Sequence, residues 1–176
     1  MRVPTGPSAE PPPKAVYDIY YDGFGDDVSF MLGAGAWGWH VEVGLHSLRL
    51  ILAGVFDRFP ALQMIVGHMG EVLPFMLARV SGALGGRTAL GPIGTRMELS
   101  VAEYLLRNFY ISTSGFFTDP PLRCALDTFG ADRIIFAVDH PFADSAAGRR
   151  FLDEAAIDDE VRAKIAHGNA ERLLRM

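Results

Sequence analysis

Residues 64–71, MIVGHMGE, begin with three large apolar residues and continue through His68, Gly70 and Glu71. Short apolar runs that contain β-branched residues and are bounded by glycine are typical of buried strands. The sequence therefore predicts a strand over Met64–Val66 that leads directly to an ionisable imidazole. A glycine-containing turn and a helix that begins near Glu71 are expected to follow.

Residues 133–142, RIIFAVDHPF, repeat this layout, with a strand predicted over Ile134–Val138 and Asp139 directly after it. In parallel α/β folds, the functional loops leave the carboxyl ends of the strands, so polar side chains at strand ends gather at one edge of the sheet. We therefore expect His68 and Asp139 to share one active-site face.

Apolar residues at helical spacing lie around these two segments. Asp119 is a good N-cap, Pro120 suits the first helical position, and Gly130 is a typical helix end. The expected elements are helices over residues 41–55, 71–80, 100–107, 120–129, 158–166 and 169–175, and a further strand over 108–112. This alternation predicts parallel βα units, and therefore an α/β fold.

The chain is expected to have two parts. Residues 1–36 are rich in proline, glycine and acidic residues and show no sustained period, which predicts an extended lead with a short helix near Lys14–Tyr20. Residues 37–176 are expected to form the folded domain, in which a glycine-rich connection over residues 82–94 follows the helix after His68.

Composition and charge exclude several functional classes. The length of 176 residues fits one domain, and the net charge of −5 without a run of basic residues argues against nucleic acid as a partner. No apolar stretch approaches the roughly 18 residues of a transmembrane helix, so no membrane partner is expected. The single cysteine, Cys124, rules out an internal disulfide framework and favours a cytoplasmic location.

Each candidate site residue has a structural and a functional interpretation. His68 could be a hydrogen-bonded core residue, and Glu71 could be a helix N-terminal acid favoured by the helix dipole. They could also form a proton-transfer pair, because a carboxylate three residues away can orient the imidazole. Asp139 could cap a turn through its side chain, or it could serve as a metal ligand or a general base.

Four motifs, spread in order over roughly residues 37–176, resemble the amidohydrolase-related metal-dependent decarboxylases. That family includes aminocarboxymuconate semialdehyde, γ-resorcylate and 5-carboxyvanillate decarboxylases. The motifs are residues 54–75 (with GVFDRFP, GHMGE and LPF), 108–115 (NFYISTSG), 130–142 (GADRIIFAVDHPF) and 165–174 (IAHGNAERLL).

The resemblance implies a TIM-type barrel that removes carbon dioxide from aromatic or enal carboxylic acids, using zinc or manganese and no organic cofactor. It implies that Asp139 is a metal ligand, that His68 handles the proton, and that Glu71 is the carboxylate partner of His68. Arg79 matches an arginine that in some relatives reaches the substrate carboxylate in a neighbouring subunit, which implies a homo-oligomer. The resemblance also implies that the small-molecule partner is a carboxylate substrate.

The sequence departs from the family pattern at its beginning. The family's N-terminal strand carries an H-x-H or E-x-H metal-binding pair, which is absent here, and Val3 stands before Pro4-Thr5 where a further metal-binding histidine is expected. Because a whole (β/α)8 barrel takes about 250 residues, we expect an incomplete barrel that corresponds to the C-terminal part.

Such a chain is expected to bind metal weakly and to be weakly active or inactive alone. It is expected to associate with a second copy or with a complementary N-terminal half. The alternatives are a lactonase-like metal-dependent hydrolase on the same scaffold, and an inactive remnant retained for oligomerisation.

Overall fold

The structure is a computed structural model that describes residues 14–84 and 97–176. The expectations for Val3-Pro4-Thr5 and for residues 85–94 lie outside these ranges. The chain divides into two compact units, Met1–Ser47 and Leu48–Met176, and the division falls within helix α3 (Gly38–Leu52). No helix in the described ranges is both long and apolar enough to cross a bilayer.

The first unit contains α1 (Lys14–Tyr20), α2 (Asp26–Gly33) and the beginning of α3. Helix α1 coincides with the short helix expected from the sequence. Helix α2 was not expected, because residues 1–36 show no sustained helical period. Asp26 and Asp27 instead occupy the first helical turn, where a negative charge complements the helix dipole.

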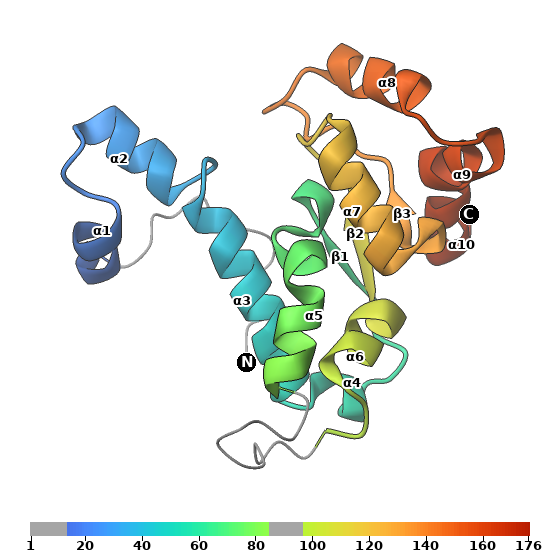
Figure 1. Ribbon diagram of the computed structural model, residues 1–176, viewed down its shortest axis with the longest axis horizontal. Coiled ribbons are helices and arrows are strands. Elements are labelled where there is room, and N and C mark those ends of the chain that lie inside the picture. The colour runs from blue at the N-terminus through green and yellow to red at the C-terminus, as the bar shows by residue number, and fades with distance from the viewer. Residues whose placement is uncertain (1–13, 85–96) are drawn as a thin grey trace. The chain divides into compact units, whose positions relative to one another are not determined.

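The second unit is built on a parallel sheet of three short strands in the order β1-β2-β3 (Figure 1). The strands are β1 (Met64–Val66), β2 (Phe109–Ser112) and β3 (Ile134–Ile135). Val66 pairs with Ile111, and Ile111 pairs with Ile134, so the three strands end near one another. All four residues of the central strand β2 are buried, so this strand lies at the core of the unit.

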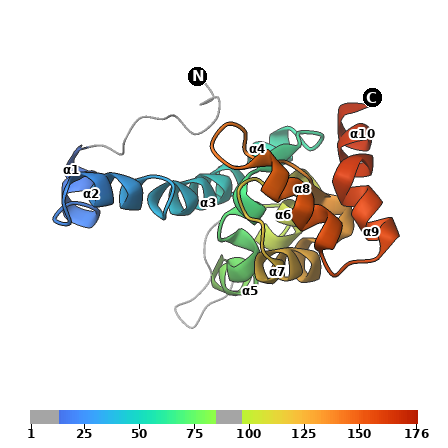
Figure 2. The same cartoon turned by 90° about the horizontal axis from the view of Figure 1, so that it is seen from above.

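Helices connect and cover these strands, as expected for parallel βα units. Helices α5 and α7 pack against each other and lie side by side in both views (Figures 1 and 2). The remaining elements of the unit are α4 (Val55–Arg58), η1 (His68–Gly70), α5 (Leu73–Leu84), α6 (Val101–Asn108), α7 (Asp119–Phe129), η2 (Ala131–Arg133), α8 (Ser145–Glu154), α9 (Asp159–Ala163), the π-helix η3 (Lys164–Gly168) and α10 (Asn169–Leu174).

Local sequence signals explain where several helices begin and end. Helix α6 starts with a capping box, in which the Ser100 hydroxyl accepts from the Glu103 amide and the Glu103 carboxylate accepts from the Ser100 amide. The Ser100 hydroxyl also donates to the Glu103 carboxylate at 2.6 Å, and this bond, followed by the one from the Ser100 amide, holds the pKa of Glu103 below its usual value. Gly130 ends α7 with a φ of 77°, which glycine adopts without strain.

Several expected boundaries were wrong. Helix α5 runs to Leu84, beyond Gly82 where the glycine-rich connection was expected to begin, and the break expected at Gly168 lies within the π-helix η3, which is followed at once by α10. The first helix stops at Leu52, because Gly54 adopts a left-handed conformation before α4 begins. Helix α5 starts at Leu73 rather than near Glu71, and α7 has Thr118 rather than Asp119 as its N-cap. Strand β3 ends at Ile135 rather than Val138, because the backbone beyond it pairs with a side chain and a helix instead of a strand.

Helix α8 was absent from the predicted elements. Its N-cap signal is nevertheless present, because the Asp144 carboxylate accepts from the Ala146 amide at 2.9 Å. The buried apolar residues of α8 are confined to Phe151 and Leu152 near its C-terminal end. Two such residues are too few to show a helical period by themselves.

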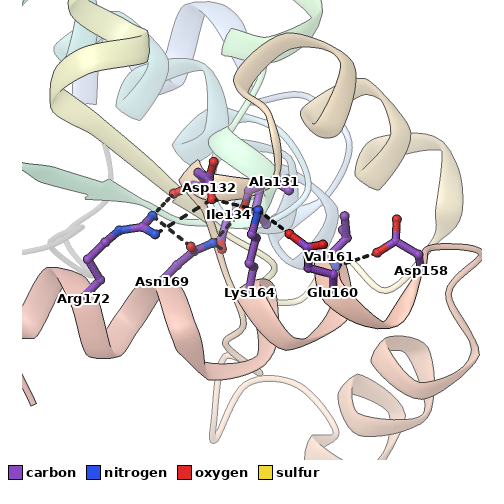
Figure 3. A network of polar contacts seen from close by, with 9 residues as sticks. All are labelled: Ala131, Asp132, Ile134, Asp158, Glu160, Val161, Lys164, Asn169 and Arg172. Carbon is purple, nitrogen blue, oxygen red and sulfur yellow. Dashed lines mark hydrogen bonds and ion pairs between the residues drawn. The ribbon is translucent and has the colours of Figure 1, made fainter.

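A buried asparagine links the C-terminal helices to the beginning of β3 by hydrogen bonds (Figure 3). The Asn169 side-chain amide donates to the carbonyls of Ala131 and Ile134, both at 2.7 Å, and its oxygen accepts from Arg172 at 3.0 Å. Asn169 is fully buried. Asn108, which directly precedes β2, makes a similar connection. Its side-chain amide donates to the carbonyl of Leu62, in the loop before β1.

Replacing Asn169 with alanine is expected to lower the free energy of unfolding by about 2–4 kcal/mol, because the carbonyls of the partly buried Ala131 and the buried Ile134 lose their donor. Urea denaturation measures this loss. Arg172→Ala is the matched control, because its half-exposed guanidinium contributes to the same network, and we expect it to cost less than about 1 kcal/mol. Equal losses in the two variants would contradict the structural role of Asn169.

Candidate active site

His68 follows β1 by two residues and begins the short helix η1. Its backbone φ of 48° is left-handed, as is that of Met69 at 55°. Gly70 makes this turn possible, because a Cβ atom there would lie 2.8 Å from the Ile111 side chain. The turn therefore packs tightly on the central strand and fixes where the imidazole emerges.

Glu71 holds the imidazole. His68 Nδ1 lies 2.8 Å from Glu71 Oε1, and the Glu71 side chain is 2% exposed. Glu71 lies two residues before α5, so it is not in the first turn of that helix. With Nδ1 directed at the carboxylate, the other ring nitrogen, Nε2, is the atom that can exchange a proton with a bound molecule.

Asp139 meets the imidazole from the other side. Its Oδ2 atom lies 3.6 Å from His68 Nε2, and the two side chains are 31% and 23% exposed. The Asp139 carbonyl accepts from the amides of Phe142 and Ala143, which closes a turn around it. His140, the next residue, is exposed and precedes Pro141 through a cis peptide bond.

Backbone strain is concentrated at these residues. Non-glycine residues rarely adopt a positive φ, and such conformations occur where function or packing enforces them. In the described ranges, His68, Met69, Glu71 and Asp139 account for all positive-φ non-glycine residues except Arg175 at the end of the last helix. The rim of the sheet is therefore held in an arrangement that local preferences disfavour.

The loop after β2 forms a third side of the site, which was not predicted from the sequence. The Ser112 and Ser114 hydroxyls lie 2.6 Å apart, and the Phe116 ring meets the His68 ring edge-on at 6.0 Å. A Cβ atom on Gly115 would lie 3.3 Å from Asp139 Oδ2 and 3.8 Å from His68 Cδ2. The sequence did contain a signal for this loop. Strand β2 lies between two parallel strands that lead to site residues, so the loop after β2 must leave the sheet at the same edge.

Replacing Gly115 with alanine is expected to disturb Asp139. The φ of 66° disfavours any side chain, so the free energy of unfolding should fall by about 1–3 kcal/mol, and the added methyl group would press on the carboxylate. Gly130→Ala is the matched control, since Gly130 has a φ of 77° but no neighbour within 4 Å. We expect both variants to lose stability in urea denaturation, and only Gly115→Ala to bind Mn²⁺ more weakly by calorimetry. Equal Mn²⁺ affinities would contradict the close approach.

Two further residues lie outside this cluster. Arg79 is exposed on α5, and its assignment to a neighbouring subunit's substrate remains a prediction. Cys124 is partly buried on α7, and burial, with a smaller effect of Asp127, raises the pKa of its thiol. A raised thiol pKa lowers the thiolate fraction, so Cys124 is unsuited to be a nucleophile.

The donor atoms at the rim suit a divalent cation. Asp139 offers a partly exposed carboxylate oxygen, which is a donor that Mn²⁺ and Zn²⁺ both accept. The separation of 3.6 Å between Oδ2 and Nε2 exceeds a direct hydrogen bond. The Asp139 carboxylate is therefore a candidate metal ligand, next to the imidazole.

Residues 22–176 match the family model described as amidohydrolase. The chain belongs to the amidohydrolase family. It is 38% identical over 177 residues to the decarboxylase orsB of Emericella nidulans, covering 98% of this chain and 51% of that protein. It is 35% identical over 158 residues to the γ-resorcylate decarboxylase of Polaromonas sp., covering 89% of this chain and 46% of that protein.

A solved structure extends the likeness to three dimensions. The dihydroxybenzoic acid decarboxylase from Polaromonas sp., with bound manganese and the inhibitor 2-nitroresorcinol, superposes with a TM-score of 0.82 at 32% identity. The match covers 94% of this amidohydrolase chain and 48% of that one. The chain thus spans about half the length of the relatives it matches. Its three parallel strands are part of a TIM-type barrel sheet, as the sequence predicted.

Proposed function

We propose that this amidohydrolase chain carries the proton-transfer pair and one metal ligand of a metal-dependent aromatic-acid decarboxylase, a carbon–carbon lyase. The observation that carries the proposal is the line of three side chains at the rim. Glu71 Oε1 lies 2.8 Å from His68 Nδ1, and His68 Nε2 lies 3.6 Å from Asp139 Oδ2. The decarboxylases among its relatives support the reaction class.

In this proposal each residue has one role. Asp139 would hold the divalent cation, which would supply Lewis-acid stabilisation of negative charge on the substrate oxygens. His68 delivers a proton from Nε2 to the ring carbon as the bond to the carboxylate breaks and carbon dioxide leaves. Glu71 accepts a hydrogen bond from Nδ1 and keeps the ring oriented. Arg79, exposed on α5, binds the substrate carboxylate of a neighbouring copy.

Manganese is the proposed metal, because the Polaromonas structure contains it. A catalytic metal site usually needs three protein ligands, and Asp139 supplies one. We propose that the other ligands come from the part of the barrel that corresponds to the half of the relatives that this chain does not span. We further propose that this part, or a second copy of the chain, covers the open edge of the sheet.

The test is a decarboxylation assay with γ-resorcylate and Mn²⁺, run on the chain alone and on the chain assembled with a polypeptide that supplies the other half of the barrel. We expect carbon dioxide release from the assembly, its loss with a chelator, and negligible release from the chain alone. The dialysed chain should also retain far less than one equivalent of metal. Release from the chain alone that survives chelation would overturn the proposal. Lactone hydrolysis by the assembly without carbon dioxide release would favour the hydrolase alternative.

A further inference from the structure

The segment that carries Asp139 leaves the sheet three residues before the carboxylate. Strand β3 ends at Ile135, and the last sheet-like bond on this side runs from the Thr113 amide to the Ile135 carbonyl at 3.1 Å. The Phe136 amide turns the other way and donates to the Ile165 carbonyl at 2.9 Å. From Ala137 onward, therefore, strand pairing does not determine the path of the backbone.

At this point a single hydroxyl binds the backbone in place of a neighbouring strand. Thr113 Oγ1 donates to the Ala137 carbonyl at 2.8 Å and accepts from the Ala137 amide at 3.0 Å. Thr113 has no exposed surface. A hydroxyl can donate and accept at once, which no aliphatic side chain of the same shape can do. Thr113 therefore binds both polar backbone groups of one residue.

The position of Asp139 depends on this pair of hydrogen bonds. Only Val138 separates Ala137 from Asp139, and the Val138 side chain is confined, because a Cβ atom on Gly148 would lie 2.9 Å from it. Beyond Asp139 the chain enters the turn in which the Phe142 amide donates to the Asp139 carbonyl at 2.7 Å. The segment is thus fixed at both ends, and Thr113 provides the fixed point nearest to the sheet.

We infer that Thr113 is a positioning residue of the proposed metal site. Its hydroxyl fixes the backbone two residues before Asp139, so that the carboxylate faces His68 Nε2. The inference rests on the proposed function, since it concerns the ligand role of Asp139. Groups that orient a metal ligand from outside typically change metal affinity by about 10–100-fold when they are removed.

The test follows the histidine ring signals of the isotope-labelled chain by NMR during titration with MnCl₂. Bound Mn²⁺ broadens signals of nearby nuclei, so the Mn²⁺ concentration that half-broadens the His68 ring signal measures occupancy at Asp139. We expect Thr113→Val to raise this concentration at least about tenfold, and Thr113→Ser, which keeps the hydroxyl, to restore it to within about threefold of the unsubstituted chain. Thr113→Ala repeats the loss of the hydroxyl in a smaller side chain, in case Thr113→Val does not fold.

Thr128→Val is the matched control. The Thr128 hydroxyl also donates to a backbone carbonyl, that of Cys124 at 2.6 Å, but within helix α7, and its removal should leave the half-broadening concentration unchanged. Equal concentrations for the unsubstituted chain, Thr113→Val and Thr113→Ala would overturn the inference and leave the proposed function intact. An unsubstituted chain in which His68 broadens no earlier than the exposed His167 would overturn both.

Discussion

Replacing Asp139 with asparagine is expected to weaken Mn²⁺ binding by about a hundredfold, which corresponds to about 3 kcal/mol at 1.4 kcal/mol per factor of ten. Asparagine keeps the shape of the side chain but loses the charge that attracts the cation. The turn around Asp139 uses its backbone carbonyl rather than its carboxylate, so the fold should survive. Calorimetric titration with MnCl₂ measures the affinity.

Asp153→Asn controls for the loss of one negative charge. Asp153 lies on α8 in an exposed ion pair with Arg149 at 2.7 Å, which holds the pKa of its carboxyl below the usual value. General attraction of cations to an acidic surface would weaken binding to a similar small degree in both variants. A hundredfold loss confined to Asp139→Asn identifies a ligand, and equal losses would remove Asp139 from the metal site.

Replacing His68 with glutamine is expected to lower turnover rather than Mn²⁺ affinity, in contrast to Asp139→Asn. Turnover of the assembled enzyme should fall by about 10²–10⁴-fold, because a positioned general acid is lost, while Mn²⁺ affinity changes little. Glu71→Gln should lower turnover less, by about 10–100-fold, since the imidazole remains but loses the carboxylate that orients it. Steady-state carbon dioxide release and calorimetry separate the two quantities.

The chain offers a second histidine–carboxylate pair as a control. His167 Nδ1 lies 3.1 Å from Glu171 Oε1, and both side chains are more than half exposed. His167→Gln should change neither turnover nor Mn²⁺ affinity. If His68→Gln instead abolished Mn²⁺ binding, the imidazole would be a ligand rather than the proton donor, and the proposed division of roles would be wrong.

The sequence predicted those parts of the fold that depend on local patterns. The strand before His68 and the end of α7 at Gly130 were predicted correctly, because an apolar run bounded by glycine and a helix-ending glycine act through neighbouring residues. Helix α8 was missed, since its few buried residues do not reveal a period. The early end of β3 depends on Thr113, which is distant in sequence and therefore invisible to a local pattern.

The same distinction applies to the site. The proximity of His68 and Asp139 could be predicted, because the carboxyl ends of parallel strands meet at one edge, although Asp139 lies four residues beyond the end of β3. Their left-handed backbone conformations could not, since tertiary packing imposes them against local preference. Gly115 and Thr113 were not predicted as residues of the site either. A glycine after a strand suggests only a turn, and a threonine in a strand pattern suggests only a β-branched strand residue.

The central claim is that Asp139 and His68 act on one bound cation and its substrate. Anomalous X-ray diffraction at the manganese absorption edge, from crystals soaked in MnCl₂, tests it most directly. We expect a peak at about 2.2 Å from a carboxylate oxygen of Asp139. A peak elsewhere on the chain, with none beside Asp139, would contradict the claim.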